Sequence, residues 1–171
     1  MGIDISQKML AEALKLKTGN IDFENCSIED YSYPREQFDL VVASLCLHYV
    51  EDISAIFKKV YHCLKPGGTF VFSVEHPICT SLLQGLYESK DGSHWPVDRY
   101  FDESERRQNW FVDGVIKYHR TTESYIMTLL NTGFTLQGLA EPHPSKEHIE
   151  QHPQLQLHSR RPALLVLKLG K

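Results

Sequence analysis

The stretch that decides the fold is FDLVVASLCLHYVEDISAIFKKVYHCLKPGGTFVFSV, residues 38–74. It begins at 38–44 with a nearly continuous apolar run rich in β-branched residues, which is typical of a strand covered on both faces in a parallel sheet. Asp52 then caps a predicted helix with a helical apolar period, and KPGG at 65–68 ends that helix. A second buried strand follows at 69–74, so the stretch predicts a strand-helix-strand unit with a right-handed crossover.

Upstream of this unit, GIDIS at residues 2–6 has the form of a strand end, an acidic residue at its tip and a helix cap. Ser6 caps a predicted helix that runs to about Lys17, and the sequence at 18–20 ends it. Residues 21–23 predict a short strand by alternation. The apolar face of the predicted helix comprises Met9, Leu10, Ala13 and Leu14.

Downstream, residues 75–120 show no sustained period. A connection of this length inside a compact domain is most often functional, so we predict an insertion or lid over the substrate side. Periodicity then predicts a helix at 122–131, a strand at 134–140, a polar His-rich loop and a last strand at 163–169.

Composition favours one globular domain. The 171 residues allow a single core, and 42% hydrophobic and 23% charged residues are near the globular average. The 18 Lys and Arg residues are scattered in a chain of net charge -4, so we expect no nucleic-acid partner. Neither a membrane span nor a secretion signal is visible, and the four cysteines form no CxxC pair. These features predict a cytoplasmic protein with a small-molecule partner and no membrane association.

The order of these elements resembles the class I methyltransferases that use S-adenosylmethionine, specifically the small-molecule type 11. The resemblance rests on GIDIS followed by Met9-Leu10, on FDLVVASLCLHYVED, on LKPGGTFVFSVEHP and on the later helix followed by TGF. It covers most of the chain and implies an α/β, Rossmann-like sheet, mostly parallel with an antiparallel last strand, in one domain over residues 1–171. It also implies S-adenosylmethionine as cofactor, methyl transfer to a small-molecule acceptor, and a homodimer as one possible assembly.

The family's first strand, glycine-rich loop and first helix have no counterpart ahead of GIDIS. The resemblance therefore implies a domain truncated at its N-terminus. That first strand normally lies in the middle of the sheet, so we expect a sheet split into two unequal pieces. The core side chains of one strand contribute roughly 10 kcal/mol, as much as the whole stability of an ordinary domain, about 5–15 kcal/mol. We therefore do not expect the full family architecture from this chain alone.

The resemblance implies cofactor contacts along the carboxyl edge of the sheet. Asp4 matches the acid that binds the ribose hydroxyls, because a carboxylate at a strand tip can accept two hydrogen bonds; the alternative role is that of a helix-entry residue. Ser27 stands at the adenine position, which is usually acidic or amide-bearing, and Glu29 or Asp30 replaces it if the strand ends two residues later. The implied cofactor contacts are Asp4, Ile5, Met9, Ser27, Ile28, Ala43, Ser44 and Leu45.

Methyl transfer requires alignment of the nucleophile, and it requires a general base only for acceptors that hold a proton at neutral pH. Candidate catalytic residues are Glu75, His76 and His119. The alternative for Glu75 and His76 is a strand-end turn closed by Pro77, and for His119 it is a helix cap that pins the insertion. Candidate substrate contacts are His48, Tyr49, Trp95, Tyr100 and Arg120.

Several of these substrate candidates have structural alternatives. His48 can instead pack at a helix entrance, and Arg120 can pin the insertion or anchor an acidic substrate. Trp95 and Tyr100, together with Trp110, can line an apolar or cation-holding pocket, or they can form a small core of the insertion itself.

Two other classes of protein stay open. One is a catalytically inactive Rossmann-like remnant that serves as a binding or regulatory module. The other is a nicotinamide-dependent oxidoreductase, which the KPGG motif, the insertion and the last strand disfavour. His148 and His152 have the spacing of helical metal ligands, but their order is not HExxH, so we predict no metal site.

Overall fold

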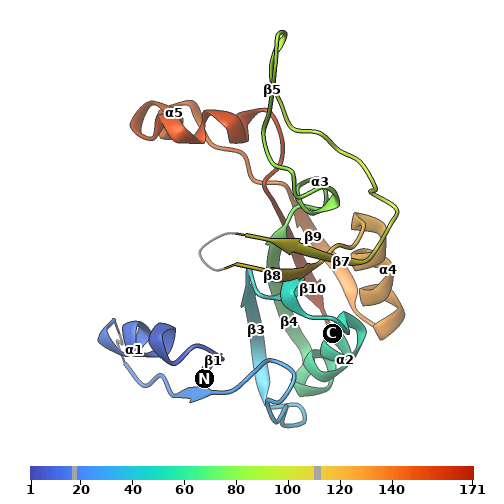
Figure 1. Cartoon of the computed structure of the whole chain (residues 1–171). Helices are drawn as coiled ribbons and strands as arrows, with labels where there is room; N and C mark the ends of the chain where they lie inside the picture. The colour runs from blue at the N-terminus through green and yellow to red at the C-terminus, as the bar shows by residue number, and fades with distance from the viewer. Residues whose placement is uncertain (17–18, 110–112) are drawn as a thin grey trace.

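The computed structural model describes residues 1–16, 19–109 and 113–171, and its centre is a four-stranded mixed sheet (Figure 1). The strand order is β3-β4-β10-β9. β3 and β4 are parallel, whereas β10 is antiparallel to both β4 and β9. The predicted Rossmann-like sheet with an antiparallel last strand is therefore confirmed. These strands are β3 (Phe38–Ser44), β4 (Leu64–Glu75), β9 (Thr135–Ala140) and β10 (Leu164–Gly170).

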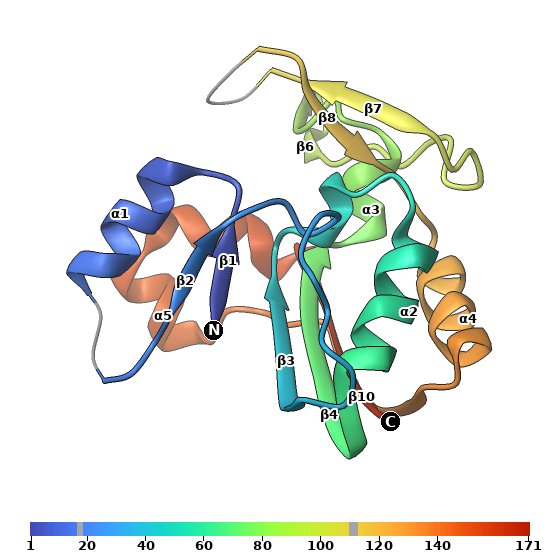
Figure 2. The ribbon, with the colours of Figure 1, turned by 90° about the horizontal axis from the view of Figure 1, so that it is seen from below.

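A second, smaller piece of sheet stands apart. β1 (Gly2–Asp4) and β2 (Phe23–Asn25) form a parallel pair, and α1 (Gln7–Lys15) follows β1. Figure 2 shows this unit to one side of the large sheet. The expected split into two unequal pieces is present. The expected apolar face of α1 is not buried, however, because no residue of α1 is buried and Met9 is 59% exposed.

The core lies between the large sheet and two helices on one of its faces, α2 (Ile53–Cys63) and α4 (Thr122–Thr132) (Figure 2). Its centre is a set of packed rings in which Phe57 lies against Phe70 and Phe72. Full burial of such a side chain contributes about 1.5–3 kcal/mol. Asp52 caps α2 by accepting a hydrogen bond from the Ala55 amide at 3.0 Å, as predicted. The core therefore holds the strand-helix-strand unit together.

Residues 75–120 are more ordered than the sequence predicts. They contain α3 (Pro77–Ser81) and two antiparallel hairpins, β5 (Tyr87–Ser89) with β6 (Gly92–His94) and β7 (Glu105–Gln108) with β8 (Val115–Tyr118). The β5-β6 hairpin extends away from the body of the molecule (Figure 1). β7 and β8 lie beyond the carboxyl ends of β3 and β4 (Figure 2).

Element boundaries agree with the prediction where the sequence period is strong. β3 covers residues 38–44 as predicted, whereas β2 lies two residues later than predicted. The KPGG segment belongs to the irregular start of β4, because the pairing register shifts between Phe38 and Leu40. The predicted end of the first helix, at residues 17–18, lies outside the described residues.

The prediction of a His-rich loop before the last strand is wrong. It contains the helix α5 (Lys146–Gln151) and a 3-10 turn, η2 (Pro153–Ser159). Ser145 caps α5 by accepting a hydrogen bond from the His148 amide at 3.1 Å. This polar helix buries none of its residues, so it shows no apolar period that the sequence could reveal.

Candidate functional site

Two cavities meet at the carboxyl end of β3. The first, of about 330 Å³, lies between β1 and β3, and we call it the β1-β3 cavity. The second, of about 700 Å³, lies between the end of the large sheet and residues 75–120, and we call it the Glu75 cavity. Ser44 lines the first cavity, and its neighbour Leu45 lines the second. Ligands in the two cavities would therefore be neighbours.

The β1-β3 cavity combines one carboxylate with apolar walls. Asp4 lies at the tip of β1, where its Oδ1 accepts a hydrogen bond from the Ser6 amide at 2.7 Å. The Asn25 side chain donates to the carbonyl oxygens of Asp4 and Ile5, at 2.9 Å each, and so fixes the strand tip. Other residues lining this cavity are Ile28, Tyr31, Tyr33, Val42, Ala43, Ser44 and Cys46.

Half of the predicted cofactor contacts come together here. Asp4, Ile28, Ala43 and Ser44 all line the β1-β3 cavity. The remaining four are placed elsewhere. Ile5 and Met9 are exposed, Ser27 donates a hydrogen bond to Asp30 Oδ2 at 2.8 Å, and Leu45 lines the Glu75 cavity.

Sequence reasoning missed two aromatic residues of this cavity. Tyr31 and Tyr33 come from the IEDYSYP segment, and their rings meet edge to face at 5.0 Å. Tyr33 donates a hydrogen bond to the Ile28 carbonyl at 2.9 Å. The cluster of tyrosines directly after a strand was the available signal, since a long loop with aromatic residues often lines a site.

The Glu75 cavity contains four of the predicted substrate and catalytic residues. His48, Tyr49, Glu75 and Trp95 line it. His48 and Tyr49 come from η1 (Leu47–Tyr49) just after β3, and Glu75 is the last residue of β4. The sequence did not indicate the other polar residues that line it, which are Cys79, Gln108, Lys117, His158 and Arg161.

The buried polar atoms of the Glu75 cavity are incompletely satisfied. Within the described ranges, four buried side-chain nitrogens have no hydrogen-bond partner: both ring nitrogens of His48, Nε1 of Trp95 and Nδ1 of His158. All three residues line this cavity. A buried polar group without a partner costs about 1–3 kcal/mol, so such groups are usually explained by a function. Their concentration at one cavity makes it a candidate ligand site.

The charges in this cavity are arranged around Glu75. Lys117 Nζ lies 2.6 Å from Glu75 Oε1, and its side chain is only 2% exposed. His48 Nε2 lies 3.9 Å from the same oxygen. Burial lowers the pKa of His48 to about 4, and this effect exceeds the attraction of Glu75, which raises the pKa. His48 is therefore neutral at pH 7 and can donate one hydrogen bond and accept another.

The predicted catalytic residues His76 and His119 do not line the Glu75 cavity. His76 Nδ1 accepts from the Ile78 amide at 3.1 Å, which caps α3, and its Nε2 lies 2.8 Å from Glu141 Oε1. His119 lies 2.8 Å from Thr80 Oγ1 through Nδ1 and 2.9 Å from the Tyr100 carbonyl through Nε2. Both rings are engaged in holding residues 75–120, so their geometry gives a catalytic role no support.

Tyr100 and Arg120, predicted as substrate contacts, also have structural partners. The Tyr100 hydroxyl accepts a hydrogen bond from the Thr122 amide at 3.1 Å at the start of α4. Arg120 Nη2 donates to the carbonyl oxygens of Val50 and Glu51 at 2.6 and 2.5 Å. The alternative role of Arg120, that of a residue that pins the insertion, agrees with these contacts. Trp110, the third candidate aromatic, lies outside the described residues.

Metal-binding side chains do not gather anywhere in the described ranges, where no group of three His, Cys, Asp or Glu residues could hold an ion. The absence of a metal stays a prediction. No helix in the described part of the chain is both long and apolar enough to cross a membrane.

The mixed sheet, with two cavities at its carboxyl edge, defines a Rossmann-like enzyme fold. The family described as "Methyltransferase domain" matches residues 1–72. A solved structure from Listeria monocytogenes, assigned to the S-adenosylmethionine dependent methyltransferases, is 42% identical with a TM-score of 0.92. The alignment covers 99% of this chain and 78% of that one. An S-adenosylmethionine dependent methyltransferase from Mesorhizobium loti is 36% identical with a TM-score of 0.92 and coverage of 99% and 79%.

A curated relative also matches the whole chain. A Haemophilus influenzae protein of uncharacterised function is 30% identical over 182 residues, with coverage of 100% of this chain and 71% of that protein. The chain therefore belongs to the S-adenosylmethionine-dependent methyltransferase family, and S-adenosylmethionine is the cofactor of this family.

Proposed function

We propose that the protein transfers a methyl group from S-adenosylmethionine to a small-molecule acceptor, with the cofactor in the β1-β3 cavity and the acceptor in the Glu75 cavity. The observation that carries this proposal is the meeting of the two cavities at consecutive residues, Ser44 and Leu45, at the carboxyl end of β3. Methyl transfer is an in-line displacement that requires the donor and the nucleophile side by side.

The residues of the β1-β3 cavity fit an adenosyl group. Asp4 provides a carboxylate that can accept hydrogen bonds from vicinal ribose hydroxyls. Ile28 and Ala43 provide apolar walls for a flat ring. Cys46 also lines this cavity, and burial raises its pKa to about 11, so it contributes a neutral thiol rather than a charge. We assign Ser27, Ile5 and Met9 no cofactor contact.

Within the Glu75 cavity, we assign Glu75 and neutral His48 to the acceptor. When bound, the cofactor supplies a sulfonium methyl: the acceptor's lone pair forms the new bond to carbon, the carbon–sulfur pair stays on sulfur to give S-adenosylhomocysteine, and the acceptor's proton is released. Neutral His48 can accept that proton or orient the nucleophile. Glu75 can stabilise a protonated His48 3.9 Å away. Residues of the 75–120 segment line one wall of the cavity, which supports our proposal that this segment covers the substrate side.

Calorimetric titration of S-adenosylmethionine and S-adenosylhomocysteine into the chain tests the cofactor half. We expect saturable binding that falls about tenfold or more in Asp4→Asn, because a hydrogen bond to a charged group contributes about 1.5–3 kcal/mol. Asp22→Asn is the matched control, since Asp22 is an exposed carboxylate of the same β1-β2 unit. A folded chain that binds neither ligand would contradict the proposal and favour the non-catalytic binding module.

A small-molecule acceptor, a homodimer and a cytoplasmic location stay predictions. The four cysteines are free thiols, which is compatible with a reducing compartment. Sedimentation of the purified chain across a range of concentrations tests the dimer.

A further inference from the structure

Cationic side chains line the Glu75 cavity and a second cavity that adjoins it at Trp95. Arg161 lines both the Glu75 cavity and an adjoining cavity of about 320 Å³, which also contains Arg160. Lys117 lines the Glu75 cavity beside Glu75, which is the only acidic residue lining either of them in the described ranges. Positive charge therefore exceeds negative charge here, although the whole chain has a net charge of -4.

Arg161 is held in place without a carboxylate. Its guanidinium stacks on the Trp95 ring at 3.6 Å from the ring centroid, and Nη1 donates to Cys79 Sγ at 2.7 Å. Among the residues that the structure describes, no carboxylate lies within ion-pairing distance of Arg160 or Arg161. A guanidinium has five N–H donors in a planar fork, so Arg161 retains donors for a ligand.

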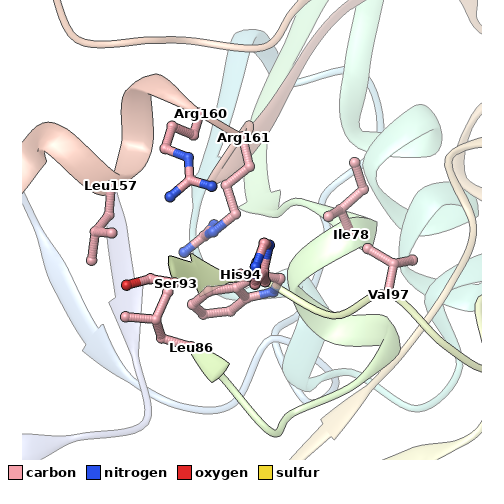
Figure 3. Close-up of a pocket in the computed structure, with 9 residues that line it drawn as sticks. Ile78, Leu86, Ser93, His94, Val97, Leu157, Arg160 and Arg161 are labelled. Atoms are coloured by element: carbon pink, nitrogen blue, oxygen red, sulfur yellow. The ribbon is translucent and has the colours of Figure 1, made fainter. Parts of the chain in front are cut away.

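Trp95, on which Arg161 stacks, also carries a donor without an acceptor among the described residues. The indole Nε1–H of Trp95 can only donate, and it has no partner in the described chain. His158 Nδ1 is likewise buried and unpartnered. Figure 3 shows the adjoining cavity, which is lined by Arg160 and Arg161 and by Ser93 and His94 of β6. Arg161 and the Trp95 indole N–H can therefore both donate to an anionic ligand.

We propose that the methyl acceptor carries a carboxylate or a phosphate, and that this group binds Arg161 at the Trp95 end of the Glu75 cavity. The inference rests on the proposed function above and specifies its acceptor. The nucleophilic end of the molecule then lies at Glu75 and His48, beside Leu45 and the β1-β3 cavity. Both anions fit the guanidinium fork, because each presents two oxygens to it.

The test uses the indole N–H signals of the uniformly nitrogen-15-labelled chain. The protein has two tryptophans, Trp95 and Trp110, and Trp95→Phe assigns the Trp95 signal. Glutarate, inorganic phosphate and the uncharged glutaramide are titrated at constant ionic strength. We expect a saturable shift of the Trp95 signal with at least one anion and none with glutaramide. Glutarate alone identifies a carboxylate acceptor, and phosphate alone a phosphorylated one.

Variants assign the anion to Arg161. Arg161→Gln should weaken anion binding about 10- to 100-fold, as expected for loss of a charged hydrogen-bonding partner. Arg35→Gln, which changes an exposed arginine elsewhere, should leave it unchanged. Arg161→Lys keeps the charge and should give an intermediate affinity. If Arg161→Gln does not fold, the comparison of glutarate with glutaramide in the unaltered chain still tests whether the site near Trp95 binds an anion.

A Trp95 signal that responds to neither anion, or equally to glutaramide, overturns the inference, as does unchanged anion affinity in Arg161→Gln. S-adenosylhomocysteine is titrated into the same samples. If S-adenosylhomocysteine binds and neither anion does, the anion site is overturned while the proposed function stands. Anion binding at Arg161 in a folded chain that binds neither S-adenosylmethionine nor S-adenosylhomocysteine overturns the proposed function while the anion site stands.

Discussion

Lys117 on β8 forms a 2.6 Å ion pair with Glu75 at the end of β4. Gln108 Oε1 on β7 accepts a second hydrogen bond from the same ammonium at 2.9 Å. The lysine side chain is 2% exposed, whereas that of Glu75 is 25% exposed. One buried cation therefore connects the β7-β8 hairpin to the central sheet, and it does so in the wall of the Glu75 cavity.

Because Lys117 is more deeply buried than Glu75, removing the charge of either residue should lower the free energy of unfolding by a different amount. Glu75→Gln removes a counter-charge of the buried Lys117 ammonium and should lower the free energy of unfolding by about 3 kcal/mol. Lys117→Met leaves Glu75 with partial access to water and should cost about 1–2 kcal/mol. Urea denaturation of both variants and of the double variant measures the coupling. Equal costs for the two single variants, or additive costs in the double variant, would contradict this reading of the pair.

His48 predicts a pH dependence of stability. Its folded pKa of about 4 lies below its ordinary value of 6.5, so the unfolded chain binds the proton more readily. Stability should therefore fall as the pH drops from about 6.5 towards 4, by roughly 2 kcal/mol at pH 5 from this group. His48→Gln should show a flatter profile between pH 7 and pH 5 in urea denaturation. His62→Gln, at an exposed histidine, is the control and should keep the original slope.

The sequence predicted the central unit well because its signals are local. Residues 38–74 contain a β-branched apolar run, a capped helix with an apolar face and a second apolar strand, and each of these patterns reports burial directly. The β7-β8 hairpin gave no such signal. Its buried side chains are Arg106 and Lys117, which are stabilised by hydrogen bonds to other segments rather than by apolar packing. A pattern of hydrophobic residues cannot reveal strands whose inner face is charged.

Only those residues of the candidate site that lie at the ends of strands could be predicted from the sequence. The family resemblance predicted Asp4 and Ser44 as cofactor contacts, and Glu75 follows the next strand at the same carboxyl edge of the sheet, where ligands of such folds bind. Lys117 and Arg161 reach the same cavity from a hairpin and from the segment before β10, far away in the sequence. Only the tertiary fold brings these two residues to Glu75 and Trp95.

Arg120 should be a structural residue with an indirect effect on the Glu75 cavity. Its guanidinium donates to the carbonyl oxygens of Val50 and Glu51, directly after the turn that contains His48. Arg120→Gln should lower the free energy of unfolding by about 2–3 kcal/mol, because two buried acceptors lose a charged donor. Arg107→Gln, at an exposed arginine, should change it by less than about 0.5 kcal/mol.

Arg120→Lys provides a second check by urea denaturation. An ammonium cannot reproduce the planar fork that reaches both carbonyl oxygens, so this variant should recover only part of the lost stability. Full recovery in Arg120→Lys would show that charge alone matters at this position.

Leu45, between the two cavities, has the left-handed backbone conformation, with φ of 53°. Its amide donates to the Ser73 carbonyl at 3.0 Å, which fixes this conformation at the end of β3. A non-glycine residue pays about 1 kcal/mol for it. Leu45→Gly should therefore be more stable than Leu45→Ala, although glycine elsewhere is the less stable choice.

Urea denaturation of this pair is compared with Leu40→Gly and Leu40→Ala, at an exposed leucine of the same strand without positive φ. At Leu40 the alanine variant should be the more stable one. The same order at both positions would show that Leu45 stores no strain. Both Leu45 variants remove a side chain that lines the Glu75 cavity, so both should lower methyl transfer even where Leu45→Gly retains stability. A strained residue kept at the meeting point of two cavities is expected when its position serves the reaction rather than the fold.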